Sequence, residues 1–439
     1  MLVALSPLLY LGLGFLMAKL FLLRPHTNWP SSLFLGLAAV YATGLASAYL
    51  IFLLLPDLKL SLLIAAVFAL VGWIAFFWRR PSWQAPTRGA VVFFFLALLV
   101  YGIKILSQPL LDWDARSIWF FHAKMIFYQG GFSIDWQNPM YRFANLDYPK
   151  LVPVLVAQNS FLLGYWNEYL PKIGLVHLLV PLLAAFSHFF ARTWSFVIYL
   201  ALALLASGSW MWNGYMDGYL ALYAGLGFLF FWRWIRGRPV ELFPAAVFLL
   251  LLPQIKKEGI LILGAAVFAW IAQPAHWPLL KQKFSRLTVR KLSFAAILLL
   301  PFLLWEYKKS SLGLTNQLVG GELVFADVWR RIFQESAFLN ITWAILRSGS
   351  VMSLLILAAA VFAAGRLRGN SAPPEWRFVL LFSLVFLTII YAILIVSPLE
   401  QHMPLSLRVN MNRVPLTVLQ AGFALIFLYL PNILGEEAR

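Results

Sequence analysis

The chain has 439 residues, of which 62% are hydrophobic and 12% charged, with a mean hydropathy of +0.81 and a formal net charge of +17. A soluble protein of this length is about a quarter charged, so the composition indicates a membrane protein. Without any cysteine, disulfides and thiolate metal sites are excluded. Basic loops on the cytoplasmic side explain the positive charge better than nucleic-acid binding does, so no nucleic-acid partner is expected.

Apolar runs separated by polar breaks predict an all-α polytopic membrane protein with about thirteen transmembrane helices. Helices are expected because unpaired backbone groups are too costly in lipid, and the ten-residue alternation of a membrane barrel is not seen. The predicted spans are 2–23, 33–55, 60–78, 89–108, 170–190, 194–212, 218–235, 240–255, 259–274, 292–305, 340–363, 378–397 and 415–431.

The distribution of charge predicts the orientation of these spans. Alternate loops collect 18 Lys and Arg against 4 Glu, whereas the loops on the other side hold 16 cations and 13 anions. The strongly basic side is expected in the cytoplasm. This places the N-terminus outside, the C-terminus inside and residues 109–169 in a large external loop of a plasma (inner) membrane protein.

The external loop is expected to carry two juxtamembrane helices. Residues 115–128 have apolar side chains at helical spacing, which suits a helix in the plane of the interface. Residues 149–163 predict a second such helix, with a short span as the alternative, which would invert every later helix. The charge count argues against that inversion.

Ionisable residues gather where predicted helices meet the external face. Such residues are costly at that depth unless they serve a site or pair with one another. Asp114 also stands where an N-cap is natural, so a capping role is an alternative to a functional one. The candidates are Asp112, Asp114, Arg116, His122 and Lys124 in "DWDARSIWFFHAK", Asp217 in "NGYMDGYLALY", Lys256 and Glu258 in "LPQIKKEGILIL", and His402, Arg408 and Arg413 in "LEQHMPLSLRVNMNRVPL".

The order of these motifs resembles the GT-C superfamily of integral membrane glycosyltransferases, in the branch of protein O-mannosyltransferases and the lipid A aminoarabinose transferase. The matching stretches are Asp114 followed by "ARSIWFFHAK", "DYPKLVP" at 147–153, "FFARTWS" followed by "GYMDGYLAL", the step Lys256-Lys257-Glu258-Gly259, and the late arginines Arg408 and Arg413. They cover about 89–275 and 398–431. The sequence departs from the family in having "DWD" rather than "DE" and three additional N-terminal helices.

The resemblance implies three parts of the chain. Residues 1–88 would form an N-terminal three-helix membrane extension. Residues 89–275 would form the catalytic core with its external loop 109–169. Residues 276–439 would supply C-terminal membrane helices with external loops at 306–339 and 398–414.

The resemblance also implies transfer of a sugar from a polyprenyl-phosphate donor to a lipid, glycan or protein acceptor on the external, periplasmic face, by inverting displacement. Asp114 would be the general base, with Asp112 as the alternative and Asp217 as a support. The two aspartates at 112 and 114 could instead share Mg²⁺ or Mn²⁺, although no cofactor is certain. Donor phosphate binding would fall to Lys256, Arg408, Arg413 and Arg116, and support of the acceptor to His122, Lys124, Glu258 and His402.

Two other classes remain open. A polytopic lipid or sugar transporter would also bury charges, but near the middle of the membrane and commonly with internal repeats. A lipid-linked glycan polymerase or an O-antigen ligase-like enzyme would use a late external loop, for which residues 306–339 qualify.

Overall fold

The computed structural model describes residues 2–21, 32–78, 83–134, 141, 144–190, 193–273, 277–285, 287–314, 329–330, 332–333, 337–347, 374–396 and 413–434. These residues form helices joined by loops, and no β-strand occurs among them beyond two isolated bridges. The predicted all-α fold is confirmed.

The helices follow the predicted spans closely. The first half of the chain contains η1 (Leu2–Leu5), α1 (Ser6–Phe21), α2 (Leu33–Leu54), α3 (Leu58–Trp78), α4 (Arg88–Ser107), the π-helical η2 (Ala115–Trp119), α5 (Phe120–Gln129), α6 (Leu151–Leu163), η4 (Leu170–Lys172), α7 (Ile173–His188), α8 (Trp194–Ser207) and η5 (Gly208–Met211). The second half contains α9 (Asp217–Ile235), η6 (Pro239–Glu241), α10 (Leu242–Ile255), α11 (Glu258–Ile271), α12 (Trp277–Phe284), α13 (Val289–Ser311), α15 (Ala337–Arg347), α17 (Pro374–Val396) and α19 (Leu416–Leu434).

Among the described residues, fewer helices have the length and hydropathy of a membrane span than the thirteen predicted. Eight described helices are long and apolar enough to cross a membrane, or nine if the bent pair α12–α13 counts as one span. The helices α10 and α11 have 14 residues each, which is about 21 Å of helix, less than the apolar thickness of a bilayer. The count of thirteen is not confirmed, and the predicted span 340–363 lies mostly outside the described residues.

The bundle has inner helices and helices that expose apolar side chains. Most of α2, α7 and α9 is buried, whereas only a third or less of α3, α4 and α8 is buried. The exposed side chains are largely leucine, valine, isoleucine and phenylalanine, which suits contact with lipid. Because α2 packs against α7, α10 and α13, the N-terminal helices belong to the same bundle as the rest.

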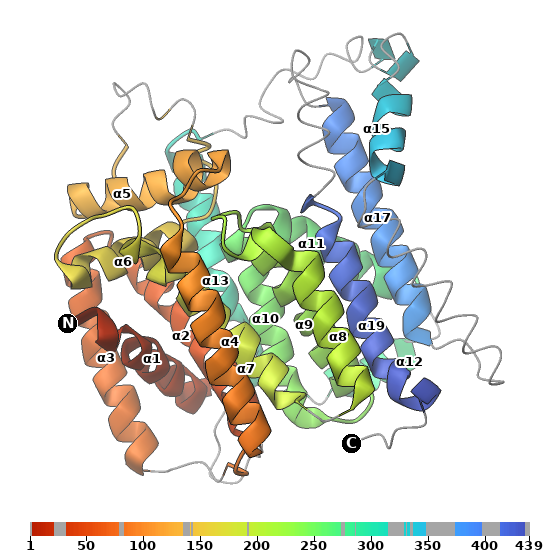
Figure 1. Ribbon diagram of the computed structural model, residues 1–439, viewed down its shortest axis with the longest axis horizontal. Helices are drawn as coiled ribbons and strands as arrows, with labels where there is room; N and C mark the ends of the chain where they lie inside the picture. The colour runs from red at the N-terminus through yellow and green to blue at the C-terminus, as the bar shows by residue number, and fades with distance from the viewer. Residues whose placement is uncertain are drawn as a thin grey trace.

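Two helices lie across one end of the bundle, and the C-terminal end of α19 lies at the opposite end (Figure 1). They are α5 and α6, so both helices predicted in the loop 109–169 are present. The helix α6 is not a surface helix, because every side chain from Leu151 to Ser160 is buried. It packs against α5, α2 and α7. An antiparallel bridge between Asp57 and Gly131 also places the turn between α2 and α3 at this end.

Candidate functional site

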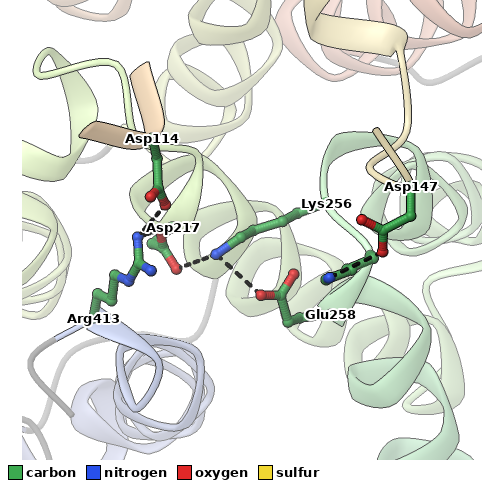
Figure 2. A network of polar contacts seen from close by, with 7 residues as sticks. Asp114, Asp147, Asp217, Lys256, Glu258 and Arg413 are labelled. Carbon is green, nitrogen blue, oxygen red and sulfur yellow. Dashed lines mark hydrogen bonds and ion pairs between the residues drawn. The ribbon is translucent and has the colours of Figure 1, made fainter. Parts of the chain in front are cut away.

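Five of the predicted side chains meet at the end of the bundle that carries α5 and α6 (Figure 2). Asp114 binds Arg413 in an ion pair, and Nη1 of Arg413 lies 3.6 Å from Oδ2 of Asp217. Nζ of Lys256 lies 2.8 Å from Oδ1 of Asp217 and 3.3 Å from Oε1 of Glu258. We call these five residues, Asp114, Asp217, Lys256, Glu258 and Arg413, the charge cluster. Four separate turns of the chain supply them.

Asp114 does not act as a helix cap. Its backbone angles, φ −59° and ψ −36°, are already helical, and its side chain makes no capping hydrogen bond. The chain enters the helix earlier, since the N–H of Arg116 donates to the carbonyl of Asp112 at 3.1 Å. The alternative of a capping role is therefore wrong, and the carboxylate is free to face Arg413. The π-helical turn that follows Asp114 is a conformation often found at functional sites.

Asp217 is placed by the start of α9. It is the first residue of that helix, where the unpaired N–H groups of the first turn favour a negative charge. Its side chain is buried, with 4% of its surface exposed. Oδ1 accepts a hydrogen bond from Lys256, while Oδ2 has no hydrogen-bond partner among the described residues and faces Arg413. Asp217 therefore lies between the two cations of the cluster.

Lys256 is placed by a tight turn between α10 and α11. Its backbone is extended, with φ −152° and ψ 146°, so the chain leaves α10 and re-enters a helix at Glu258. Gly259 allows the turn, because a Cβ there would lie 2.1 Å from the carbonyl carbon of Leu252. The close approach to Leu252 therefore explains why the Lys256-Lys257-Glu258-Gly259 motif has glycine at position 259.

The two lysines of this turn point to different partners. Nζ of Lys257 lies 3.0 Å from Oδ2 of Asp147 and 4.2 Å from the centre of the Tyr148 ring. The main-chain carbonyl of Asp147 accepts a hydrogen bond from the indole of Trp305 at 3.2 Å. The segment before α6 is thereby fixed against both α11 and α13, next to the charge cluster.

Electrostatics keep the two cations of the cluster charged. Burial lowers the pKa of Lys256, but the carboxylates of Asp217 and Glu258 outweigh it, so the pKa is raised above the ordinary lysine value. For Arg413 burial is likewise outweighed by Asp217 and Asp114, and its pKa is raised. Both side chains therefore remain cations, and each faces two carboxylates.

Asp112 lies at the edge of the cluster rather than in it. Its pKa is raised by burial and by the negative charge of Asp114, while a hydrogen bond with Asn213 opposes the rise. The described residues contain no group of three histidine, cysteine, aspartate or glutamate side chains that could hold a metal ion. The carboxylate of Asp114 is already bound by a guanidinium. The Mg²⁺ or Mn²⁺ shared by Asp112 and Asp114 stays a prediction.

The remaining predicted residues lie apart from the charge cluster or outside the described part of the chain. Lys124 pairs with Glu168 at 3.0 Å on the exposed surface, and Arg116 is exposed. His122 is buried, and its Nδ1 lies 3.0 Å from Nζ of Lys150. His402 and Arg408 fall outside the described residues.

Sequence reasoning missed the burial of two ionisable residues in the segment before α6. Lys150 is fully buried, hydrogen-bonded to the carbonyl of Leu146 and 4.8 Å from the ring of Trp305. Asp147 is buried as well. The signal available in the sequence was the stretch "DYPK" directly before an apolar helix, which reads as an ordinary polar loop.

No known protein family, curated protein or solved structure matches the chain.

Proposed function

We propose that the protein is a membrane glycosyltransferase that moves a sugar from a polyprenyl-phosphate donor to a lipid, glycan or protein acceptor at the end of the bundle carrying α5 and α6. The observation that carries the proposal is the charge cluster. Two cations and three carboxylates from four distant turns converge at one end of an apolar helical bundle. A phosphate at the surface of a membrane and an acceptor from the aqueous side can meet at such a place.

The chemistry needs one base and cations near the leaving group. The acceptor hydroxyl attacks the anomeric carbon, the bond from that carbon to the phosphate oxygen breaks, and the lipid phosphate departs with the electron pair. The carboxylate of Asp114 accepts the hydroxyl proton. Arg413 and Lys256 stabilise the charge that grows on the departing phosphate. Asp217 lies between these two cations and keeps both in place.

The charge at the opposite end of the bundle supports an external location for the cluster. Nζ of Lys283 donates to the carbonyl of Trp234, and Arg290 donates to the carbonyl of Leu20, which joins the ends of α9 and α1 to basic residues. Arg236 pairs with Glu375 at the same end of α9. Basic ends of this kind are typical of the cytoplasmic side. We therefore propose a multi-pass protein of the plasma (inner) membrane with the N-terminus outside and the C-terminus inside.

The position of the charges argues against the transporter alternative. A transporter is expected to hold charged groups near the middle of its spans, whereas the cluster lies at helix ends. Within the described bundle, the buried His177 of α7 is engaged on both ring nitrogens. Nδ1 lies 2.6 Å from the Tyr41 hydroxyl, and Nε2 lies 2.9 Å from the Ser6 hydroxyl. These are neutral partners, which suits a structural histidine.

The ligase-like alternative relies on residues 306–339, most of which lie outside the described residues.

The proposal is tested by sugar transfer in vesicles that contain the purified protein and polyprenyl-linked donors extracted from cell membranes. We expect Asp114→Asn to lower turnover by about a hundredfold or more, which is typical for loss of a general base. Asp57→Asn is the matched control, since Asp57 is an exposed aspartate at the same end of the bundle and asparagine can also cap α3.

Three results are informative. Loss of turnover with Asp114→Asn together with normal turnover of Asp57→Asn supports Asp114 as the general base. Full activity of Asp114→Asn contradicts the base assignment. A wild-type protein that transfers sugar from no polyprenyl-linked donor contradicts the transferase itself.

A further inference from the structure

The charge cluster has more carboxylates than cations. Lys256 and Arg413 stand against Asp114, Asp217 and Glu258, which gives a net charge of −1 when all five are ionised. Each cation already faces two carboxylates. A phosphodiester would add another negative charge, so it gains a strong contact only if it takes a cation away from a carboxylate.

The pair between Arg413 and Asp114 is the one most accessible for such an exchange. The side chains of Lys256 and Asp217 are only 2% and 4% exposed, whereas those of Arg413 and Asp114 are 12% and 13% exposed. Asp114 is not held by a capping bond to its own helix. Moving it away from Arg413 therefore breaks no bond of the helix start.

Arg413 can change partner without losing all its negative neighbours. Oδ2 of Asp217 lies 3.6 Å from Nη1 and has no hydrogen-bond partner among the described residues. A guanidinium has five N–H donors in a planar fork that matches a phosphate. It can therefore turn its fork to a phosphate while Asp217 continues to compensate its charge.

We propose, building on the proposed function, that the donor phosphate displaces Asp114 from Arg413 and thereby frees this carboxylate to accept the proton of the acceptor. While Arg413 binds Asp114, its guanidinium covers Oδ2 of this carboxylate. That oxygen becomes accessible to the acceptor hydroxyl only when the donor is in place, so donor binding precedes proton abstraction.

The proposed exchange of partners at Arg413 predicts how donor affinity changes when the charge of Asp114 is removed. If Asp114 competes with the phosphate for Arg413, removal of its charge should strengthen donor binding although it abolishes the base. If Asp114 instead positions Arg413 for the phosphate, the same change should weaken binding. We expect Asp114→Asn to lower the Kd about tenfold, which corresponds to about 1.4 kcal/mol.

The experiment measures the Kd of polyprenyl monophosphate for the full-length protein in lipid nanodiscs, with neutral polyprenol as the probe that lacks the phosphate. The matched control is Asp112→Asn, which removes the same charge two residues away but from a side chain that bonds Asn213 rather than Arg413. We expect about tenfold tighter binding for Asp114→Asn and less than about threefold for Asp112→Asn. Arg413→Lys keeps a cation for folding and should weaken binding because it lacks the fork.

Two outcomes overturn the exchange alone. They are equal gains for the two aspartate variants, which general electrostatics would produce, and weaker binding by Asp114→Asn. A wild-type protein that binds the polyprenyl monophosphate no better than polyprenol contradicts the proposed donor class itself, and the exchange fails with it. The failures of the two proposals are therefore distinguishable.

Discussion

Gly259 offers a direct test of the turn that places Lys256. A Cβ at position 259 would lie 2.1 Å from the carbonyl carbon of Leu252, 2.2 Å from its oxygen and 2.5 Å from the nitrogen of Pro253. All three are main-chain atoms of α10, so no change of side-chain rotamer can relieve the clash. Ordinary contact begins at 3.4 Å, so Gly259→Ala must open the turn by about 1.3 Å, the difference between 3.4 Å and 2.1 Å.

The expected cost of Gly259→Ala has two parts. Forcing a methyl group into a closely packed site costs about 1–3 kcal/mol. Opening the turn also lengthens the contact of 2.8 Å between Lys256 and Asp217, and a charge-assisted hydrogen bond contributes about 1.5–3 kcal/mol. We expect the free energy of unfolding to fall by about 3–5 kcal/mol, measured by reversible denaturation in mixed detergent micelles.

Gly264→Ala is the matched control, because Gly264 belongs to the same helix and a Cβ there meets nothing within 4 Å. Alanine is the better helix former by up to about 1 kcal/mol, so this variant should keep or slightly raise the stability. If the two variants lose equally little stability, α10 and α11 do not approach as closely as described. The placement of Lys256 derived from that approach would then be wrong.

The remaining predictions concern other charged groups. Asp147→Asn should cost about 3 kcal/mol of unfolding free energy, because it removes the buried carboxylate that faces Lys257. Glu168→Gln should cost less than about 1 kcal/mol, because the pair between Glu168 and Lys124 is exposed. Equal costs of the two variants in detergent denaturation would contradict the difference in burial. Burial holds the pKa of Lys150 well below 10.5, so the folded protein binds fewer protons than the unfolded chain and stability should rise with pH from that lowered pKa up to about 10.5. Lys150→Met should reduce this slope, and a pH profile of unfolding free energy that Lys150→Met leaves unchanged would refute the argument.

The helices could be predicted from the sequence because their signal is local. Runs of apolar residues bounded by polar breaks mark the ends of α2, α4 and α9 to within a few residues. The same breaks point to Asp114, Asp217 and Lys256, since an ionisable residue beside an apolar run must lie near a helix end. The sequence therefore predicts the members of the charge cluster but not the contacts between them.

The contacts could not be predicted because they join distant turns of the chain. Asp114 and Arg413 are 299 positions apart, and nothing local in either stretch specifies the other. The burial of Lys150 and Asp147 could not be predicted either. Their sequence reads as a solvated loop, yet both are buried, because α5 and α6 fold over this end of the bundle. Burial of a loop residue depends on packing between elements, which hydropathy patterns do not report.

The pair between Asp114 and Arg413 is better explained by function than by stability. Taking two charges out of water is costly, and apolar residues of similar volume often stabilise a protein as well as a buried ion pair does. The helix start does not need Asp114, because its side chain makes no capping bond. Asp114 has no capping role and binds Arg413, which also contacts the buried carboxylate of Asp217. Such an arrangement is expected at a site that binds or transfers a charged group. This reasoning supports the transferase proposal independently of the order of motifs in the sequence.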